Sequence, residues 1–371
     1  MMKRIWIVAL ALLMALCAVG CNQGTQDADG TAEDADRQEM VVVATEEPAA
    51  ETPQPTPEIT PEPTAEPVRS TTSGKILNGS ELYRPAIVSI ENASGARPQT
   101  GLMEADIVYE FLVESNITRF QALYSDNVPS IVGPVRSARY YFIDLQQEWN
   151  GLYAHVGYTG LSGRYARGWS DCAIHLSGGE WFERIEKSGV SSVHSVYFYL
   201  QQAIDNEYGD HRPERNERFL FGEGVTYADA TQVSRVDVPF TGSTDIYYTY
   251  DAATGRMLRY QDGKAFETLS GDGQGTRQQV AVNNLIIQHC DYGMVPAENQ
   301  PGEDKGRRSV GLTGTGKCEY IVNGQLLTGT WERETLDDFT RYYLDDGTLV
   351  RLEAGNTWIE IIPTSAEIVV S

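Results

Sequence analysis

Apolar and polar positions divide this chain of 371 residues into three parts. Residues 5–19 form an unbroken apolar run, residues 22–73 are mostly polar residues and prolines, and segments of mixed pattern follow. The apolar run is shorter than the roughly 20 residues that a membrane-spanning helix requires. Residues 74–371 are numerous enough to bury more than one hydrophobic core.

The first half of the mixed part combines strand and helix patterns. Runs of β-branched and aromatic residues predict strands over residues 85–90, 105–112 and 117–124. Apolar residues that recur every three or four positions predict helices over residues 134–149, 180–187 and 196–208, the last ending at Gly209.

After about residue 225 the pattern changes to short alternating runs. They are separated by dipeptides typical of two-residue hairpin turns, namely Asp262-Gly263, Asn323-Gly324 and Asp346-Gly347. The predicted strands cover residues 280–288, 319–322, 325–331, 340–344, 349–352 and 358–362. We therefore expect an α+β fold. Residues 75–225 would form a first domain with a mixed β-sheet and several helices, and residues 226–371 a β-rich antiparallel second domain packed against it.

The N-terminus has the features of a secretory signal. Lys3 and Arg4 precede the apolar run, and small residues lead to Cys21 in a pattern that resembles a bacterial lipoprotein cleavage box. We expect residues 1–21 to be a lipoprotein signal peptide and the Cys21 thiol to be lipidated. Two acyl chains, at ~0.8 kcal/mol per buried methylene, anchor a protein stably. The expected location is therefore the extracytoplasmic face of the cell membrane.

Residues 22–74 are predicted to be a disordered tether. Twelve acidic residues against two arginines give residues 22–73 a net charge of −10, and seven prolines fall between Pro48 and Pro67. Such a composition cannot bury enough apolar surface to offset its ordering entropy. The rest of the chain, residues 74–371, has a net charge of −15, which argues against nucleic acid as a partner but is compatible with a local basic pocket.

Arginine is used in place of lysine over a long stretch of the first domain. No lysine lies between Lys75 and Lys187, where eight arginines occur. Planar guanidinium groups suit paired contacts with carboxylates or other oxyanions. The predicted helix start at Pro134 would place Arg136 and Arg139 in the first two turns. Two interpretations remain open: ion pairs with Glu110, Glu114 or Asp106, or an anion site at the helix N-terminus.

Several strings resemble the YerB-like lipoproteins, a bacterial family of unknown function. They are Asn92, Arg97-Pro98-Gln99, Gly101-Leu102, Ala105-Asp106, Glu110, Glu114, Thr118-Arg119-Phe120, Gly133-Pro-Val-Arg-Ser-Ala-Arg139, His155, His194, Gly314-Thr-Gly316, Asn323-Gly324, Thr330-Trp331 and Gly355-Asn-Thr-Trp358-Ile-Glu360. The resemblance implies an extracytoplasmic lipoprotein with a mixed first domain and a β-rich second domain. It supplies no catalytic residues. The sequence departs from the family pattern at Ser191-Ser-Val-His-Ser195, where Pro-His-Asn is expected.

The sequence gives little support for a metal site, a nucleotide site or a catalytic nucleophile. The histidines and cysteines lack the spacing of a metal site, so no metal and no cofactor are expected. Residues 311–317 match a phosphate-loop pattern except that Cys318 stands where Ser or Thr is required, so no nucleotide is expected. We interpret His155 as a core histidine at a buried strand, with a catalytic base as the alternative, and Cys172 as a buried thiol.

Three functional hypotheses follow. The first is a non-catalytic envelope module that binds a cell-wall component or an envelope protein. Its candidate ligand-binding residues are Arg97, Gln99, Glu110, Arg119, Arg136, Ser137, Arg139, His155 and His194. The second is a cell-wall or glycan hydrolase whose site is built from Arg97, Glu110, His155 and His194. The third is a passive structural lipoprotein with no small ligand.

Overall fold

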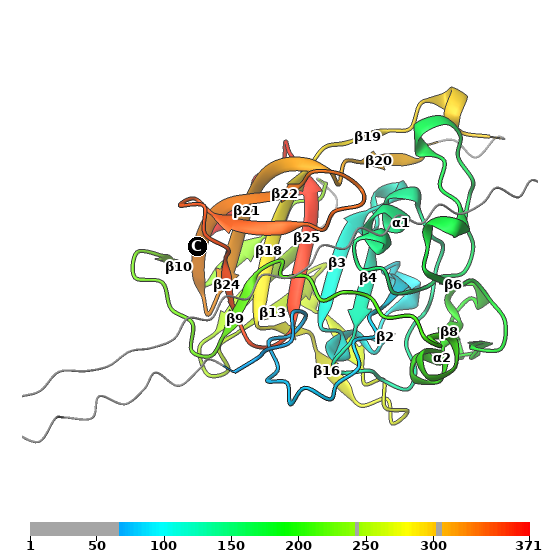
Figure 1. Ribbon diagram of the computed structural model, residues 1–371, viewed down its shortest axis with the longest axis horizontal. Coiled ribbons are helices and arrows are strands. Elements are labelled where there is room, and N and C mark those ends of the chain that lie inside the picture. The colour runs from blue at the N-terminus through cyan, green and yellow to red at the C-terminus, as the bar shows by residue number, and fades with distance from the viewer. Residues whose placement is uncertain (1–66, 242–244, 302–305) are drawn as a thin grey trace, which may run out of the picture. The chain divides into compact units, whose positions relative to one another are not determined.

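An eleven-stranded mixed sheet lies at the centre of the structure (Figure 1). This computed structural model describes residues 67–241, 245–301 and 306–371. The predicted signal peptide, Cys21 and residues 22–66 of the predicted tether lie outside the described residues. Residues 67–74, which were predicted to belong to the disordered tether, are part of the fold, with Ser70 and Thr72 buried. The strand order is β10 (Thr231–Gln232), β22 (Gln325–Arg333), β21 (Gly314–Val322), β18 (Asn284–Cys290), β25 (Thr357–Pro363), β3 (Ile107–Leu112), β4 (Thr118–Tyr124), β1 (Ala86–Glu91), β5 (Leu152–Ala154) and β6 (Ile174–Leu176), with β23 (Arg341–Leu344) beside β22.

The centre of this sheet joins segments that are far apart in the sequence. β3 pairs in parallel with β25 on one side and antiparallel with β4 on the other. Every residue of β3 and β4 is buried, because both faces of the sheet are covered. Strands from both sides of residue 225 therefore form one continuous sheet, and residues 64–371 form one compact unit.

A second, antiparallel sheet of six strands packs against one face of the large sheet. It contains β14 (Lys264–Ala265), β13 (Arg256–Gln261), β12 (Ile246–Asp251), β11 (Arg235–Asp237) and β26 (Val369–Val370), with β17 (Ala281–Val282) beside β13. Smaller sheets pair β2 (Gln99–Thr100), β15 (Glu267–Leu269) and β16 (Arg277–Gln279), then β7 (Phe182–Arg184) with β8 (Val196–Phe198), β9 (Leu220–Gly222) with β24 (Arg351–Glu353), and β19 (Tyr292–Met294) with β20 (Arg308–Val310).

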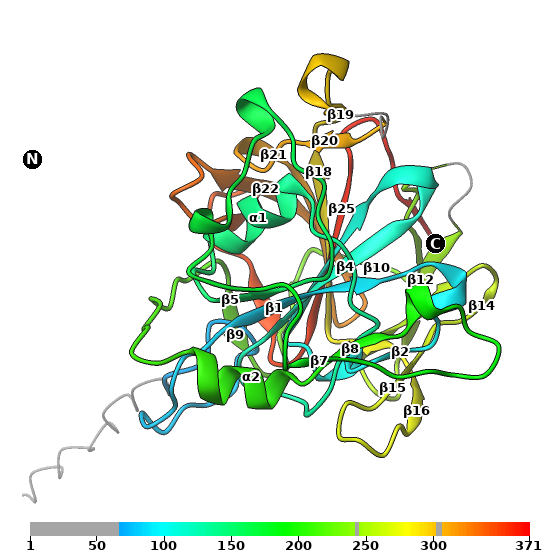
Figure 2. The same ribbon diagram turned by 90° about the vertical axis from the view of Figure 1, so that its right-hand side faces the viewer.

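The hydrophobic core has two parts, one on each face of the large sheet. On the face toward the second sheet, the ring of Phe120 meets those of Trp358 and Phe266 edge-on, with centroids 5.3 and 5.9 Å away. On the opposite face, Phe111 packs against aromatic residues of α1 (Tyr140–Gln147). Figure 2 shows α1 beside β1 and β5.

The helical content is lower than the sequence predicted. Two α-helices, α1 and α2 (Leu200–Glu207), occur in the described residues besides short 3-10 turns, so the expectation of several helices in the first domain was wrong. The β-rich α+β class is consistent with the structure. No helix in the described part of the chain has the length and apolar character needed to cross a membrane.

Tertiary pairing explains where the helix predictions failed. Residues 133–138 run extended after a cis Gly133–Pro134 peptide, because Val135 and Arg136 bond through their backbone N–H groups to Val196 and Ser89. The helix therefore begins at Tyr140 and not at Pro134. The second predicted helix is replaced by β7, which pairs with β8. β8 takes up the start of the third predicted helix, and only α2, which ends before Gly209, remains of it.

Replacing Phe120 by Ala should destabilise the protein by about 3–5 kcal/mol, because it leaves a cavity between the two sheets. Denaturant unfolding of the variant and the wild type measures this difference. Val369→Ala is a suitable control because Val369 is 62% exposed. It should change the unfolding free energy by less than about 0.5 kcal/mol. Equal losses for the two variants would contradict the described packing.

Candidate functional site

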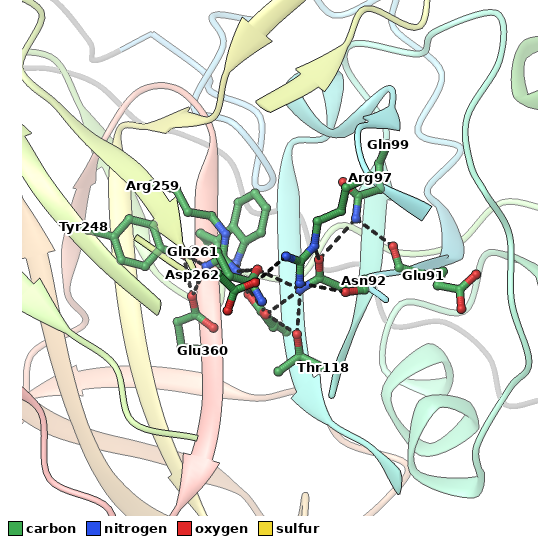
Figure 3. A network of polar contacts seen from close by, with 12 residues as sticks. Glu91, Asn92, Arg97, Gln99, Thr118, Tyr248, Arg259, Gln261, Asp262 and Glu360 are labelled. Carbon is green, nitrogen blue, oxygen red and sulfur yellow. Dashed lines mark hydrogen bonds and ion pairs between the residues drawn. The ribbon is translucent and has the colours of Figure 1, made fainter. Parts of the chain in front are cut away.

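Two polar clusters lie on opposite faces of the large sheet. Neighbouring side chains of a strand point to opposite faces, and in β4 Phe120 points toward the second sheet while Arg119 points toward α1. We call the cluster on the side of Phe120 the carboxylate network. It consists of Asn92, Glu110, Thr118, Tyr248, Arg259, Gln261 and Glu360 (Figure 3).

The centre of the carboxylate network is a guanidinium group between two carboxyl groups. Glu110 of β3 stands directly opposite Glu360 of β25 in the strand register. Arg259 of β13 reaches both: its Nη2 lies 3.0 Å from Glu110 Oε2 and its Nη1 lies 3.2 Å from Glu360 Oε1. None of the three side chains has exposed surface. Tyr248 donates a hydrogen bond to Glu360 from the same side.

Asn92 connects this centre to the protein surface. Its side-chain N–H donates to Glu110 at 3.3 Å and to Gln261 at 3.1 Å. Its side-chain oxygen accepts from Arg97 Nε at 3.0 Å and from Gln99 at 3.2 Å. Arg97 also pairs with the exposed Asp262 at 2.7 Å, where a cavity of about 470 Å³ opens to solvent.

The charges of the network balance only if one carboxyl group is protonated. Burial, followed by the charge of Glu110, raises the pKa of Glu360 well above its ordinary value. The protonated form of Glu360 is therefore favoured, and the 3.0 Å contact of Arg259 with Glu110 is the ion pair that remains. Because the carboxyl groups have no exposed surface, this network joins the two sheets and offers a substrate no access.

The second cluster, which we call the arginine cluster, consists of Arg119, Arg136, Ser137 and Arg139 with Glu91, Glu114 and His194. Arg139, at the N-cap position of α1, contacts both oxygens of Glu114 through Nε at 2.9 and 3.0 Å. Although burial opposes ionisation, the hydrogen bonds and charge of Arg139 lower the pKa of Glu114 to about 2. Glu114 is thus the partner of Arg139 among the three that the sequence suggested.

Arg136 and His194 share the carboxylate of Glu91, which is buried. Arg136 Nε lies 3.1 Å from Glu91 Oε1, and His194 Nδ1 lies 2.8 Å from Glu91 Oε2. Arg136 also donates to the backbone oxygen of Val193 at 3.1 Å. Both arginines of the Gly133–Arg139 string are therefore paired with acids. Arg139 pairs with Glu114, one of the three acids that the sequence suggested, whereas Arg136 pairs with Glu91, which the sequence did not suggest.

Arg119 differs from its neighbours. It is only 5% exposed, its Nη1 donates to the Ser137 backbone oxygen at 2.8 Å, and its Nε has no partner. Within the described residues it forms no ion pair with a carboxylate. Burial and the charges of Arg139 and Arg136 lower the pKa of Arg119 to about 10, so it remains cationic at neutral pH. An uncompensated buried charge is costly to a folded protein.

His155 lies in a separate aromatic group after β5. Its Nδ1 contacts the backbone oxygen of Gly157 at 3.0 Å, and its Nε2 lies 2.8 Å from His175 Nε2. Trp169 stacks on His175 with ring centroids 4.1 Å apart. Burial and the neighbouring His175 lower the pKa of His155 to about 4, so the ring is neutral at pH 7. This environment is that of a core histidine.

The predicted site residues thus fall into three places. Arg97, Gln99 and Glu110 belong to or contact the carboxylate network; Arg119, Arg136, Ser137, Arg139 and His194 form the arginine cluster; His155 lies apart. Glu110 and His155 have no exposed surface, so the four residues of the hydrolase hypothesis do not line one cleft. Cys172 is also buried, and burial raises the pKa of its thiol to about 12.

Sequence reasoning missed Arg259, Glu360 and Tyr248 as members of a site. A signal was present, because Glu360 interrupts the apolar run from Trp358 to Ile362. Arg259 is likewise on the inward face of its alternating strand, as Met257 is. Charged residues at inward positions of a strand indicate a buried ion pair.

Glu360→Gln should make the stability of the protein less dependent on pH. The pKa of Glu360 is raised in the folded chain, so the folded state holds this proton more tightly than the unfolded state does. Stability is then fully present below the ordinary pKa and falls as the pH rises toward the folded pKa, by up to about 1.4 kcal/mol per pH unit. Gln does not ionise, so the variant should gain stability over the wild type as the pH rises above the ordinary pKa of a glutamic acid.

Urea unfolding over this pH range measures the effect. Glu319→Gln is a matched control with the opposite sign, because His289 and Lys317 hold the pKa of Glu319 below its ordinary value against the effect of burial. That variant should lose stability at neutral pH. Parallel pH curves for the wild type and Glu360→Gln would show that Glu360 is charged in the folded protein.

Comparisons with known proteins place the chain in a family. Residues 72–211 match the N-terminal domain of a protein family of unknown function, DUF3048, and residues 236–359 match its C-terminal domain. A Bacillus subtilis protein, YerB, whose name describes it as a lipoprotein, is 29% identical over 286 residues, which are 76% of this chain and 81% of that protein.

The fold agrees with this relationship. The crystal structure of Bacillus subtilis YerB superimposes with a TM-score of 0.65 and 25% sequence identity, over 82% of this chain and 99% of the YerB chain. The resemblance inferred from the arginine-rich strings is thereby confirmed. The chain belongs to the YerB-like family whose two parts are the N-terminal and C-terminal domains of DUF3048.

Proposed function

We propose that this protein is a lipoprotein, anchored through Cys21 on the extracytoplasmic face of the cell membrane, that binds an acidic group of a cell-wall component at the arginine cluster. The anchor is supported by the pattern of residues 1–21 and by the name of the YerB relative. The acidic segment that precedes the described residues would act as a tether and hold the folded part away from the membrane surface.

The unpaired guanidinium of Arg119 is the observation that carries the binding proposal. Arg136 and Arg139 each contact a carboxylate, whereas the nearby Arg119 forms no ion pair within the described residues. An acidic ligand group would supply the missing negative charge. The N-terminus of α1 adds to the positive potential, because no side chain caps it and its first turn contains no acid.

The chemistry of the cluster favours binding over bond cleavage. Guanidinium groups donate hydrogen bonds but do not accept protons near neutral pH. The buried His155 and Cys172 are held in their neutral forms and lie outside the arginine cluster. The arrangement is therefore suited to holding an oxyanion in a fixed place.

Arg119→Met should weaken binding without weakening the fold. A hydrogen bond to a charged group contributes about 1.5–3 kcal/mol, so the dissociation constant should rise about 10- to 100-fold. The unfolding free energy should stay the same or increase, because an uncompensated buried charge is removed. Sedimentation with isolated cell walls and calorimetric titration with soluble muropeptides, using the detergent-solubilised full chain, measure the binding.

Arg235→Met is the matched control. Arg235 is paired with Asp237 on the second sheet and takes no part in the arginine cluster, so its loss should leave binding unchanged. Equal binding by the wild type and Arg119→Met would contradict the proposal. A loss of several kcal/mol of stability in Arg119→Met would instead show that Arg119 is retained for the fold.

A further inference from the structure

The arginine cluster continues onto the second half of the chain. Arg307 Nη1 lies 3.4 Å from Glu114 Oε1, on the same carboxylate that Arg139 holds. Its Nη2 donates to Thr159 Oγ1 at 2.8 Å. Residues 302–305, which precede it, lie outside the described residues. Arg139 and Arg307 therefore stand side by side, although they come from different halves of the chain.

Arg308 extends the row by one further position. Its Nε donates to the backbone oxygen of Val113 at 2.9 Å, and its Nη2 donates to Asn116 Oδ1 at 2.7 Å. These contacts place Arg308 next to the turn that contains Glu114. Arg139, Arg307 and Arg308 thus gather at the turn that contains Glu114. Arg119 lies close enough to Arg136 and Arg139 for their charges to lower its pKa. We call these five arginines the arginine row.

The arginine row is a local exception on an acidic molecule. Among the described residues Arg119 and Arg308 contact no carboxylate, whereas residues 74–371 carry a net charge of −15. Its outer members are partly accessible, with 31% of the Arg136 side chain exposed. Arg136 and Arg308 are partly exposed, whereas Arg119 is only 5% exposed. Contacts to several acidic groups would therefore be made mainly by Arg136 and Arg308.

We infer that the ligand is a flexible polyanion, a polymer with repeating phosphate or carboxylate groups, that lies along the arginine row across both halves of the chain. This inference rests on the proposed function and adds the class of the ligand. One acidic group occupies the place beside Arg119 and Arg139, and a neighbouring group along the polymer meets Arg308. Planar guanidinium groups match such oxyanions by paired hydrogen bonds.

Binding should increase with the length of the anion. The probes are orthophosphate, pyrophosphate and linear inorganic polyphosphates of defined length, titrated into the detergent-solubilised full chain. A polyphosphate long enough to span the row should bind at least about tenfold more tightly than pyrophosphate, and the plot of log K against log salt should be steeper than about −2. Comparison of polyphosphate with an oligocarboxylate of equal charge shows whether the row prefers phosphate or carboxylate groups.

Arg308→Met separates this inference from the proposed function. The variant should lose several-fold in affinity for long polyphosphate and about one unit of salt slope, while pyrophosphate binding stays unchanged. Arg308→Lys keeps the charge and should keep most of the length dependence. Arg119→Met should weaken binding of all the anions, and Arg277→Met, in the exposed pair with Glu267, should weaken none.

The outcomes distinguish the two ideas. If short and long anions bind equally and Arg308→Met has no effect, the polyanion is excluded while the acid-binding site at Arg119 stands. If neither the phosphates, the oligocarboxylate nor cell walls bind, both proposals fail. Tenfold tighter binding of a single-stranded oligonucleotide than of polyphosphate with the same charge would overturn the inference in favour of nucleic acid.

Discussion

One guanidinium group between two buried carboxyl groups determines how the two sheets fit together. The parallel pairing of β3 with β25 sets Glu110 directly opposite Glu360, and like charges in such positions repel. The cation that relieves this repulsion comes from β13 of the other sheet. A slip of β13 by one residue would turn Arg259 to the outer face and leave both carboxyl groups without it. The ion pair therefore specifies the register of β13 and the docking of the second sheet, whatever its net contribution to stability.

Local sequence signals predicted the strands and turns well and the helices poorly. Asp262-Gly263 and Asn323-Gly324 form the predicted two-residue turns, with positive φ at all four positions. Each of these turns depends only on its own two residues. The stretch from Pro134 to Ala138 has helical spacing, but its backbone bonds are satisfied by β1 and by residues about 60 positions later. Periodicity in a single segment contains no information about such distant partners.

The same distinction explains which parts of the site could be predicted. The arginine cluster was visible because arginine without lysine is a compositional feature, and Glu114 lies near enough in sequence to suggest itself as a partner. The carboxylate network was not visible as a network, because Arg259 lies 149 positions from Glu110 and 101 from Glu360. The inward positions of Arg259 and Glu360 indicate that each charge needs a partner, but they do not indicate which residue that partner is. Glu110 and Glu360 come together only because β3 pairs in parallel with β25, and no local pattern indicates this pairing.

The carboxylate network and the arginine cluster differ in charge balance and in access to solvent. In the carboxylate network a protonated Glu360 leaves one anion for one cation, so the closed interior is neutral. At the arginine cluster the cations outnumber the acids, next to a surface that solvent reaches. The surrounding body is acidic, and its repulsion is screened beyond about 8 Å at physiological ionic strength. The excess positive charge therefore acts at contact distance. A polymer with several acidic groups, as we infer for the ligand, meets that condition better than a single small anion does, because binding of one group holds the next group close.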